Sequence, residues 1–441
     1  MRVHSVRAHT FQGSTTVPGD KSISHRALLF SALSEGLCRI ENLGPGADVR
    51  STAECLRRLG VSIERREGAV EVTGGGLTSL KAPTELLDCG NSGTTMRLLS
   101  GVIAGAGVGG TLDGDESLRK RPMRRILQPL REMGAAASGA RNPDGDELAP
   151  LLFAPGKKLV GCRHELKVAS AQVKSCLLLA GLFADGETVV REPEPSRDHT
   201  ERMLRAFGVN LGFGPDGAVS IRRPDGPLHA PSILTVPGDP SSAAFWIGAT
   251  LLIPGAAFEI ECVDVNPTRT GFIRVLQRMG AEVVIEPTGE RAGDPVATLR
   301  VKGGGRLKGT DVRAGEVPSL LDEIPMLAVV ASQAHGVTTV SGASELRVKE
   351  SDRLAQMVMG LRAMGVDVEE HPDGFRMEGP FPLKGAFIDA AGDHRIAMSF
   401  AIAGMCADGE TSVKGAQWAD ISYPGFFQLL QKHSAGAVRI G

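Results

Sequence analysis

Apolar residues recur at helical spacing just ahead of a recurring glycine. In the clearest stretch, Leu354, Met357, Val358, Leu361 and Met364 stand at positions i, i+3, i+4, i+7 and i+10, as on one face of a helix. A glycine comes next, and a segment that reads VDVEE follows it. Glycine commonly ends a helix because it adopts a positive φ without strain. The pattern therefore predicts a helix, a glycine turn and then a strand.

The same signature returns along the chain as RRLGV, REMGA, RAFGV, QRMGA and RAMGV. The glycines are Gly60, Gly134, Gly208, Gly280 and Gly365, with a looser sixth copy at Gly436. They are separated by about 71 to 85 residues, which is too long for the short-unit solenoids. The simplest interpretation is six units of about 72–85 residues. The alternative is chance recurrence of a common helix–glycine–strand connection.

The tetrapeptide VPGD occurs twice, at residues 17–20 and 236–239, about three units apart. This spacing predicts two compact domains of three units each, with a boundary near residues 230–236. KSISHR follows the first copy, whereas the apolar PSSAAFW follows the second. Cations are unfavourable at the start of a helix, where the helix dipole is positive. The first copy therefore indicates a function for its charges.

Composition narrows the class of protein. The 441 residues include 51 acidic and 49 basic ones, which argues against a general nucleic-acid or membrane surface but allows a local basic pocket. The seven cysteines are dispersed and form no CxxC motif or Cys/His cluster. We therefore expect reduced thiols, no metal and, without an apolar N-terminal segment or a long apolar run, a cytoplasmic protein.

Most predicted helices open with hydroxyls, small residues and cations. Examples are DKSISHR, DCGNSGTTMR, KVASAQVKS, SRDHTERM and AGDHRIAM. Backbone N–H groups, hydroxyls and the helix dipole together form anion sites, so repeated cations at these positions indicate binding of anions. The simpler alternatives are solvated arginines, N-caps and hydrogen-bonded structural histidines. The candidate caps are Asp20, Asp198 and Asp393, and the candidate structural histidines are His25, His199 and His394.

Eight motifs in order resemble the signatures of the 5-enolpyruvylshikimate-3-phosphate (EPSP) synthase family. They are VPGDKSISHRALL, CGNSGTTMR, RKRPM, VASAQVKS, SRDHTERM, LLDEIP, RVKESDR and GDHRIAM, and they span residues 17 to about 425. The resemblance implies an α/β (α+β) fold, a two-domain inside-out α/β barrel with three βαβαββ repeats per domain. It implies domains at 12–232 and at 1–11 plus 233–441, a site in the cleft between them, and a monomer.

The resemblance also implies a reaction and its residues. The family transfers the enolpyruvyl group of phosphoenolpyruvate to the 5-hydroxyl of shikimate 3-phosphate and releases phosphate, without a metal or organic cofactor. The residues implied for shikimate 3-phosphate are Lys21, Ser22, Arg26, Ser170, Ala171, Gln172, Arg197, Asp322 and Lys349. Those implied for phosphoenolpyruvate are Lys21, Asn91, Gly93, Arg121, Gln172, Arg353 and Arg395. Asp322 would be the base toward the 5-hydroxyl, and Glu350 with Lys21 would protonate the methylene carbon.

Two rival functions remain open at this stage. The sister enolpyruvyl transferase that acts on UDP-N-acetylglucosamine typically has Lys-Asn near its start and a reactive cysteine. Here the pair is Lys21-Ser22, and no cysteine lies between Cys89 and Cys162. The other rival is an inactive anion-binding repeat protein, which the presence of every implied acid and arginine argues against. One contact of the family is in doubt, because Ile421 stands where some members have lysine.

Overall fold

A computed structural model describes residues 1–143, 145–156 and 158–441 and divides the chain into two compact units. The N-terminal unit is Gly19–Pro237 with Glu290–Asp294, and the C-terminal unit is Met1–Pro18, Gly238–Gly289 and Pro295–Gly441. The boundaries expected from the sequence, after residues 11 and 232, lie a few residues before the observed boundaries after Pro18 and Pro237. Strand pairing explains the difference. Strand β2 (Gln12–Thr16) runs parallel to β16 (Ala257–Asp264), and β15 (Ile233–Thr235) runs parallel to β3 (Ser34–Glu41).

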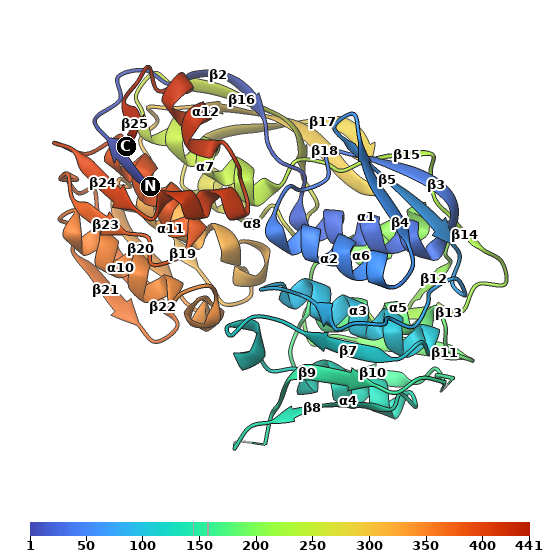
Figure 1. Cartoon of the computed structure of the whole chain (residues 1–441). Coiled ribbons are helices and arrows are strands. Elements are labelled where there is room, and N and C mark those ends of the chain that lie inside the picture. Colours follow the sequence, from blue (N-terminus) through green and yellow to red (C-terminus); the bar gives the residue numbers. More distant parts are fainter. Residues whose placement is uncertain (144, 157) are drawn as a thin grey trace. The chain divides into compact units, whose positions relative to one another are not determined.

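The described residues of the N-terminal unit form three sheets of one design, and Figure 1 labels most of their strands. The first has the order β14 (Leu228–His229), β3, β5 (Ala69–Gly75), β4 (Ser62–Arg66), with β15 also on β3. The second has the order β6 (Leu87–Asp88), β7 (Gly110–Asp113), β9 (Glu147–Phe153), β8 (Ala137–Arg141). The third has the order β10 (Arg163–Glu165), β11 (Glu187–Arg191), β13 (Val219–Arg222), β12 (Leu211–Phe213). In each sheet the first strand of this order runs parallel to the second, and the remaining pairs in the order are antiparallel. Strand β15 adds a second parallel pair to the first sheet.

The helices of this unit fall into two kinds, which alternate along the chain. Three are buried along almost their whole length: α1 (Lys21–Leu33), α3 (Gly93–Ala106) and α5 (Ala171–Gly181). Three bury mainly one face: α2 (Ala47–Arg58), α4 (Arg124–Glu132) and α6 (His199–Ala206). A short 3-10 helix, η1 (Leu118–Lys120), precedes α4. Because helices that are apolar on every side must lie in the interior, α3 packs against both α1 and α5.

The C-terminal unit repeats the design. One sheet has the order β17 (Glu282–Arg291), β18 (Asp294–Lys302), β16, β2. Another has the order β19 (Asp311–Val312), β20 (Gly336–Val340), β22 (Gly374–Gly379), β21 (Val368–His371). A further sheet has the order β23 (Phe387–Asp389), β24 (Thr411–Lys414), β1 (Arg2–Ser5), β25 (Val438–Ile440). The buried helices of this unit are α7 (Pro240–Leu252), α9 (Ile324–Ala331) and α11 (His394–Gly404), and its outer helices are α8 (Gly271–Arg278), α10 (Arg353–Ala363) and α12 (Phe426–His433). The 3-10 helices are η2 (Val317–Ser319), η3 (Leu321–Glu323), η4 (Ser344–Val348) and η5 (Ala416–Ile421).

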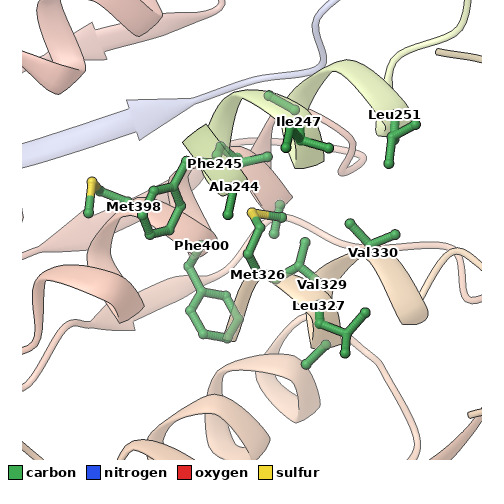
Figure 2. Packing of buried hydrophobic residues seen from close by; sticks show 14 of the residues in the cluster. Ala244, Phe245, Ile247, Leu251, Met326, Leu327, Val329, Val330, Met398 and Phe400 are labelled. Atoms are coloured by element: carbon green, nitrogen blue, oxygen red, sulfur yellow. The ribbon is translucent and has the colours of Figure 1, made fainter. Parts of the chain in front are cut away.

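The buried helices approach one another closely, which explains the abundance of glycine. In Figure 2, Phe245 of α7, Met326 of α9 and Phe400 of α11 converge in the core of the C-terminal unit. A Cβ atom on Gly248 of α7 would lie 2.7 Å from Cε of Met326. In the N-terminal unit, a Cβ atom on Gly101 of α3 would lie 2.1 Å from the carbonyl oxygen of α5 Cys176. The backbone of Cys176 leaves no room for a side chain at position 101, whereas a methyl group at position 248 would require the Met326 side chain to move.

The predicted repeat is present in the structure. All six glycines of the signature follow a helix and adopt a positive φ, between 82° and 104°. Within the described residues, six sheets share one order of four strands, with β15 added to the first, and they match the six predicted units; the fold is mixed α/β as predicted. Strand β1 lies between β24 and β25 in the sixth sheet and pairs antiparallel with both. Barrel closure stays a prediction. Within the described residues, no helix is long and apolar enough to cross a membrane.

Candidate active site

The first VPGD turn places Lys21 at the start of α1. Asp20 caps this helix, and its side chain accepts a hydrogen bond from the Ile23 backbone at 2.8 Å, so its alternative interpretation as an N-cap is confirmed. The ammonium of Lys21 lies 3.0 Å from an oxygen of Asp48, and its side chain is 39% exposed. Lys21 is therefore anchored at one end of a helix and accessible to a ligand.

Arg26, one turn further along α1, is a buried cation that binds neutral oxygens. It donates from Nε to the Thr200 hydroxyl at 2.7 Å, from Nη2 to the Ser175 hydroxyl at 2.6 Å and from Nη1 to the Ser22 carbonyl at 2.8 Å. Burial lowers the pKa of Arg26 to about 10, although Glu201 opposes the shift. Hydroxyl and carbonyl ligands orient a guanidinium without neutralising it, so the charge remains available to attract an anion.

The start of α3 brings two guanidinium groups against Gly93. A Cβ atom at this position would lie 2.9 Å from Nη1 of Arg97 and 3.3 Å from Nη1 of Arg121. Nη2 of Arg121 donates to Oδ1 of Asn91 at 2.6 Å, which fixes this guanidinium beside the helix end. The α3 N-terminus, with Ser92 as its cap, adds backbone N–H groups and the positive end of the helix dipole. These groups form a compact anion cradle.

Arg97 is a functional candidate that the sequence analysis did not select. It is buried, and its Nη1 donates to Oε1 of Gln172 at 2.5 Å. Nε2 of Gln172 donates in turn to the Thr94 hydroxyl at 2.9 Å, so both ends of the amide are fixed. The available signal was position, because Arg97 lies four residues after Gly93 and therefore on the same helix face. Its place in an apolar helix made it unusual.

The remaining predicted residues of this unit lie at the starts of α5 and α6. Ser170 caps α5 by accepting from the Val173 backbone at 3.4 Å, and Ala171 is the first residue of that helix. Arg197 is partly buried just before α6. Asp198 occupies the N-cap position of α6, as the alternative interpretation expects, but its side chain makes no cap hydrogen bond and accepts from Nε of Arg202 at 2.9 Å.

All three histidines are buried, but only His25 and His199 make the hydrogen-bond contacts that the structural alternative requires, because neither ring nitrogen of His394 has a hydrogen-bond partner among the described residues. Nδ1 of His25 lies 2.7 Å from the Thr52 hydroxyl, and Nδ1 of His199 lies 3.0 Å from a carboxylate oxygen of Asp294. Burial lowers the pKa of His25 to about 3 and that of His394 to about 4. Both imidazoles are therefore neutral near pH 7.

The C-terminal unit gathers acids around Arg353. Nε of this arginine donates to Oδ2 of Asp393 at 2.8 Å, Nη2 donates to Oε2 of Glu350 at 2.5 Å, and Nη1 lies 3.5 Å from Oδ1 of Asp322. The arginine side chain is only 1% exposed. Burial alone would raise the pKa of Asp393, but Arg353 lowers it below its usual range. Arg353 thus holds both predicted proton-transfer groups, Asp322 and Glu350, in one cluster.

Lys349 and Arg395 complete this cluster. Nζ of Lys349 lies 4.0 Å from Oδ1 of Asp322, and desolvation lowers the lysine pKa although Asp322 opposes the shift. Nη1 of Arg395 donates to the Asp322 carbonyl at 3.0 Å. Asp393 caps α11 by accepting from the Arg395 backbone at 2.8 Å, so its alternative interpretation as a cap is also confirmed. The five predicted residues of the C-terminal unit therefore lie together.

The two groups of residues define a class of protein. Each unit presents cations at helix starts, and the C-terminal unit adds carboxylates beside them, which is the chemistry of an enzyme that binds small polyanions and transfers protons. Comparison with known proteins narrows the class. The family model for EPSP synthase (3-phosphoshikimate 1-carboxyvinyltransferase) matches residues 7–430, and the chain belongs to this family.

Individual relatives and solved structures agree. The chain is 51% identical over 427 residues to the 3-phosphoshikimate 1-carboxyvinyltransferase of Synechococcus sp. (strain CC9605), covering 96% of each chain. It is 47% identical to that of Geobacter sp. (strain M21), covering 96% of this chain and 97% of the relative. EPSP synthase from Acinetobacter baumannii superposes with a TM-score of 0.89 at 41% identity over the whole of both chains. The enolpyruvyl transferase NikO from Streptomyces tendae, at 18% identity and a TM-score of 0.77, shares the fold.

Proposed function

We propose that this chain transfers the enolpyruvyl group of phosphoenolpyruvate to the 5-hydroxyl of shikimate 3-phosphate and releases phosphate. The observation that carries the proposal is the cluster of Asp322, Glu350 and Lys349 around the buried Arg353, in a chain of the EPSP synthase family. This cluster supplies two carboxylates for proton transfer beside cations for anionic substrates. We also propose a cytoplasmic monomer that needs no metal or organic cofactor.

The N-terminal unit would bind most of both substrates. The groups assigned to shikimate 3-phosphate here are Lys21, Ser22, Arg26, Ser170, the Ala171 backbone, Gln172 and Arg197. Those assigned to phosphoenolpyruvate are Lys21, Asn91, Gly93, Arg121 and Gln172. The orientation of Arg26 by neutral oxygens supports its role, since an incoming phosphate would meet a charge that is not already neutralised by a direct ion pair.

The C-terminal unit would supply the proton transfers. Asp322 removes the proton of the 5-hydroxyl as its oxygen bonds to C2 of phosphoenolpyruvate, and Glu350 with Lys21 delivers a proton to C3. The resulting tetrahedral adduct loses phosphate when a proton leaves C3 again. Lys349 would bind shikimate 3-phosphate, and Arg353 and Arg395 would bind phosphoenolpyruvate.

Glu350 is held in place by Arg353, whose Nη2 donates to Oε2 of the Glu350 carboxyl group at 2.5 Å. Its use as an acid requires that this carboxyl group carry a proton before it delivers one to C3. The proposal also requires that the residues of both units act on one pair of substrates.

The test is product formation from the two substrates. Incubation with phosphoenolpyruvate and shikimate 3-phosphate should give equal amounts of phosphate and 5-enolpyruvylshikimate 3-phosphate, detected by mass spectrometry. A parallel reaction with UDP-N-acetylglucosamine should give no enolpyruvyl product. Absence of the shikimate product would contradict the proposal.

A further inference from the structure

Glu192 makes a set of buried contacts that the proposed mechanism does not use. It stands directly after strand β11, and its side chain is only 7% exposed. One carboxylate oxygen, Oε1, accepts from the Ser170 backbone N–H at 2.7 Å. The other, Oε2, accepts from the Ser196 hydroxyl at 2.7 Å and lies 2.8 Å from Nζ of Lys174. Both oxygens therefore have partners, and the partners lie on different segments.

Lys174 is the counter-ion that allows this carboxylate to be buried. Its ammonium lies 2.8 Å from Oε1 of Glu201 as well, and both of these side chains are 5% exposed. Burial alone would lower the pKa of Lys174, but Glu201 and Glu192 raise it above its ordinary value, so the lysine is charged. A buried ion pair offsets the cost of desolvation only when its charges are this close, and removing one partner strongly destabilises the fold. The triad is thus a rigid element.

The two serines that Glu192 contacts are next in the chain to residues proposed to bind shikimate 3-phosphate. Ser170 caps helix α5 and directly precedes Ala171 and Gln172. Ser196 directly precedes Arg197. One carboxylate therefore joins the segment that carries Gln172 to the segment that carries Arg197. A bidentate acceptor with a buried counter-ion fixes the separation of the two segments more strongly than either hydrogen bond alone.

We propose that Glu192 is a positioning residue for shikimate 3-phosphate, and that Lys174 holds it in place. This inference rests on the proposed function. Glu192 sets the distance between the segment of Ser170 and Gln172 and the segment of Arg197, so that both reach one ligand. Its loss would leave the ligand groups present but misplaced, which weakens binding of shikimate 3-phosphate more than it slows the chemical step.

Two variants separate positioning from simple folding. Glu192→Gln keeps the size of the side chain and one acceptor but loses the charge and the second acceptor. We expect the KM for shikimate 3-phosphate to rise about 10- to 100-fold, as for loss of a charge-assisted hydrogen bond, with kcat changed less than about threefold. Ser196→Ala removes only the hydroxyl contact and should raise this KM about three- to tenfold. Glu194→Gln, at an exposed position nearby, is the matched control and should change neither value.

Steady-state phosphate release by the full chain decides the matter. If the unmodified chain shows no release that depends on shikimate 3-phosphate, the proposed function and this inference both fail. If it does, and Glu192→Gln keeps the parental KM or lowers kcat alone, only the positioning role is overturned. Should Glu192→Gln fail to fold, Ser196→Ala decides, and an unchanged KM there overturns the role.

Discussion

Replacing Gly93 with alanine tests the anion cradle at the start of α3. The new methyl group would stand 2.9 Å from Nη1 of Arg97 and 3.3 Å from Nη1 of Arg121. Ordinary contact needs about 3.5 Å, so the Arg97 guanidinium must move by roughly half an ångström. This movement stretches its 2.5 Å hydrogen bond to Gln172, which is proposed to bind both substrates.

The expected magnitude is one charge-assisted hydrogen bond, about 1.5–3 kcal/mol. This corresponds to a rise of about 10- to 150-fold in the KM for phosphoenolpyruvate. Folding should change little, because Gly93 is the first residue of α3 and does not adopt the positive φ that would strain an alanine. The variant therefore separates an effect on the site from an effect on the scaffold.

The assay is steady-state phosphate release at saturating shikimate 3-phosphate, combined with thermal unfolding. Gly93→Ala should keep its melting temperature and lose affinity for phosphoenolpyruvate. Gly226→Ala is the control, because a Cβ atom there meets nothing within 4 Å. A KM within twofold of the parent would refute the placement of phosphoenolpyruvate beside Gly93, Arg121 and Gln172.

Four further changes follow from the contacts of the site. Asp322→Asn should lower kcat by about 10²–10⁴-fold without lowering the melting temperature, and an unchanged kcat would exclude it as the base. Because the pKa of Lys349 is lowered, the protein should lose affinity for shikimate 3-phosphate at a pH below the range in which an ordinary lysine loses its proton. The Lys349→Arg variant should keep its affinity to higher pH in calorimetric titrations, because arginine stays charged. Arg353→Met leaves buried carboxylates without their cation and should lower the free energy of unfolding by about 3–5 kcal/mol. Arg376→Met, at an exposed position, should not lower it, and equal effects of the two variants in denaturant titrations would contradict this. Because the pKa of His25 is lowered to about 3, its stabilising contribution is complete above about pH 6.5 and declines as pH falls toward 3; His25→Gln should flatten this dependence in urea titrations.

The repeat architecture could be predicted from the sequence because each unit ends a helix in the same way. The six signature glycines adopt the positive φ that the helix–glycine–strand pattern requires. Strand exchange could not be predicted from local pattern. Nothing in the residues around β1 or β15 indicates that β1 completes the last sheet of the chain or that β15 joins the first, because pairing over such distances depends on tertiary packing.

The candidate site could be predicted only in part. Motifs with a cation at a helix start identified Lys21, Arg26 and Arg395, because the charge contradicts the local preference of the helix dipole. Arg97 and Lys174 lie within the motifs CGNSGTTMR and KVASAQVKS, but the sequence does not show which side chains they contact. Their partners come from other helices or loops, so their significance depends on the fold. The same reason explains why Glu192, in a loop of ordinary polar sequence, was not selected.

The most direct test of the central claim is phosphate release from phosphoenolpyruvate by the purified chain, measured with shikimate 3-phosphate, with UDP-N-acetylglucosamine and with neither. We predict release that saturates with shikimate 3-phosphate and stays at background in the other two reactions. Release with UDP-N-acetylglucosamine alone would assign the chain to the other acceptor. Background release in all three reactions would contradict the proposed function.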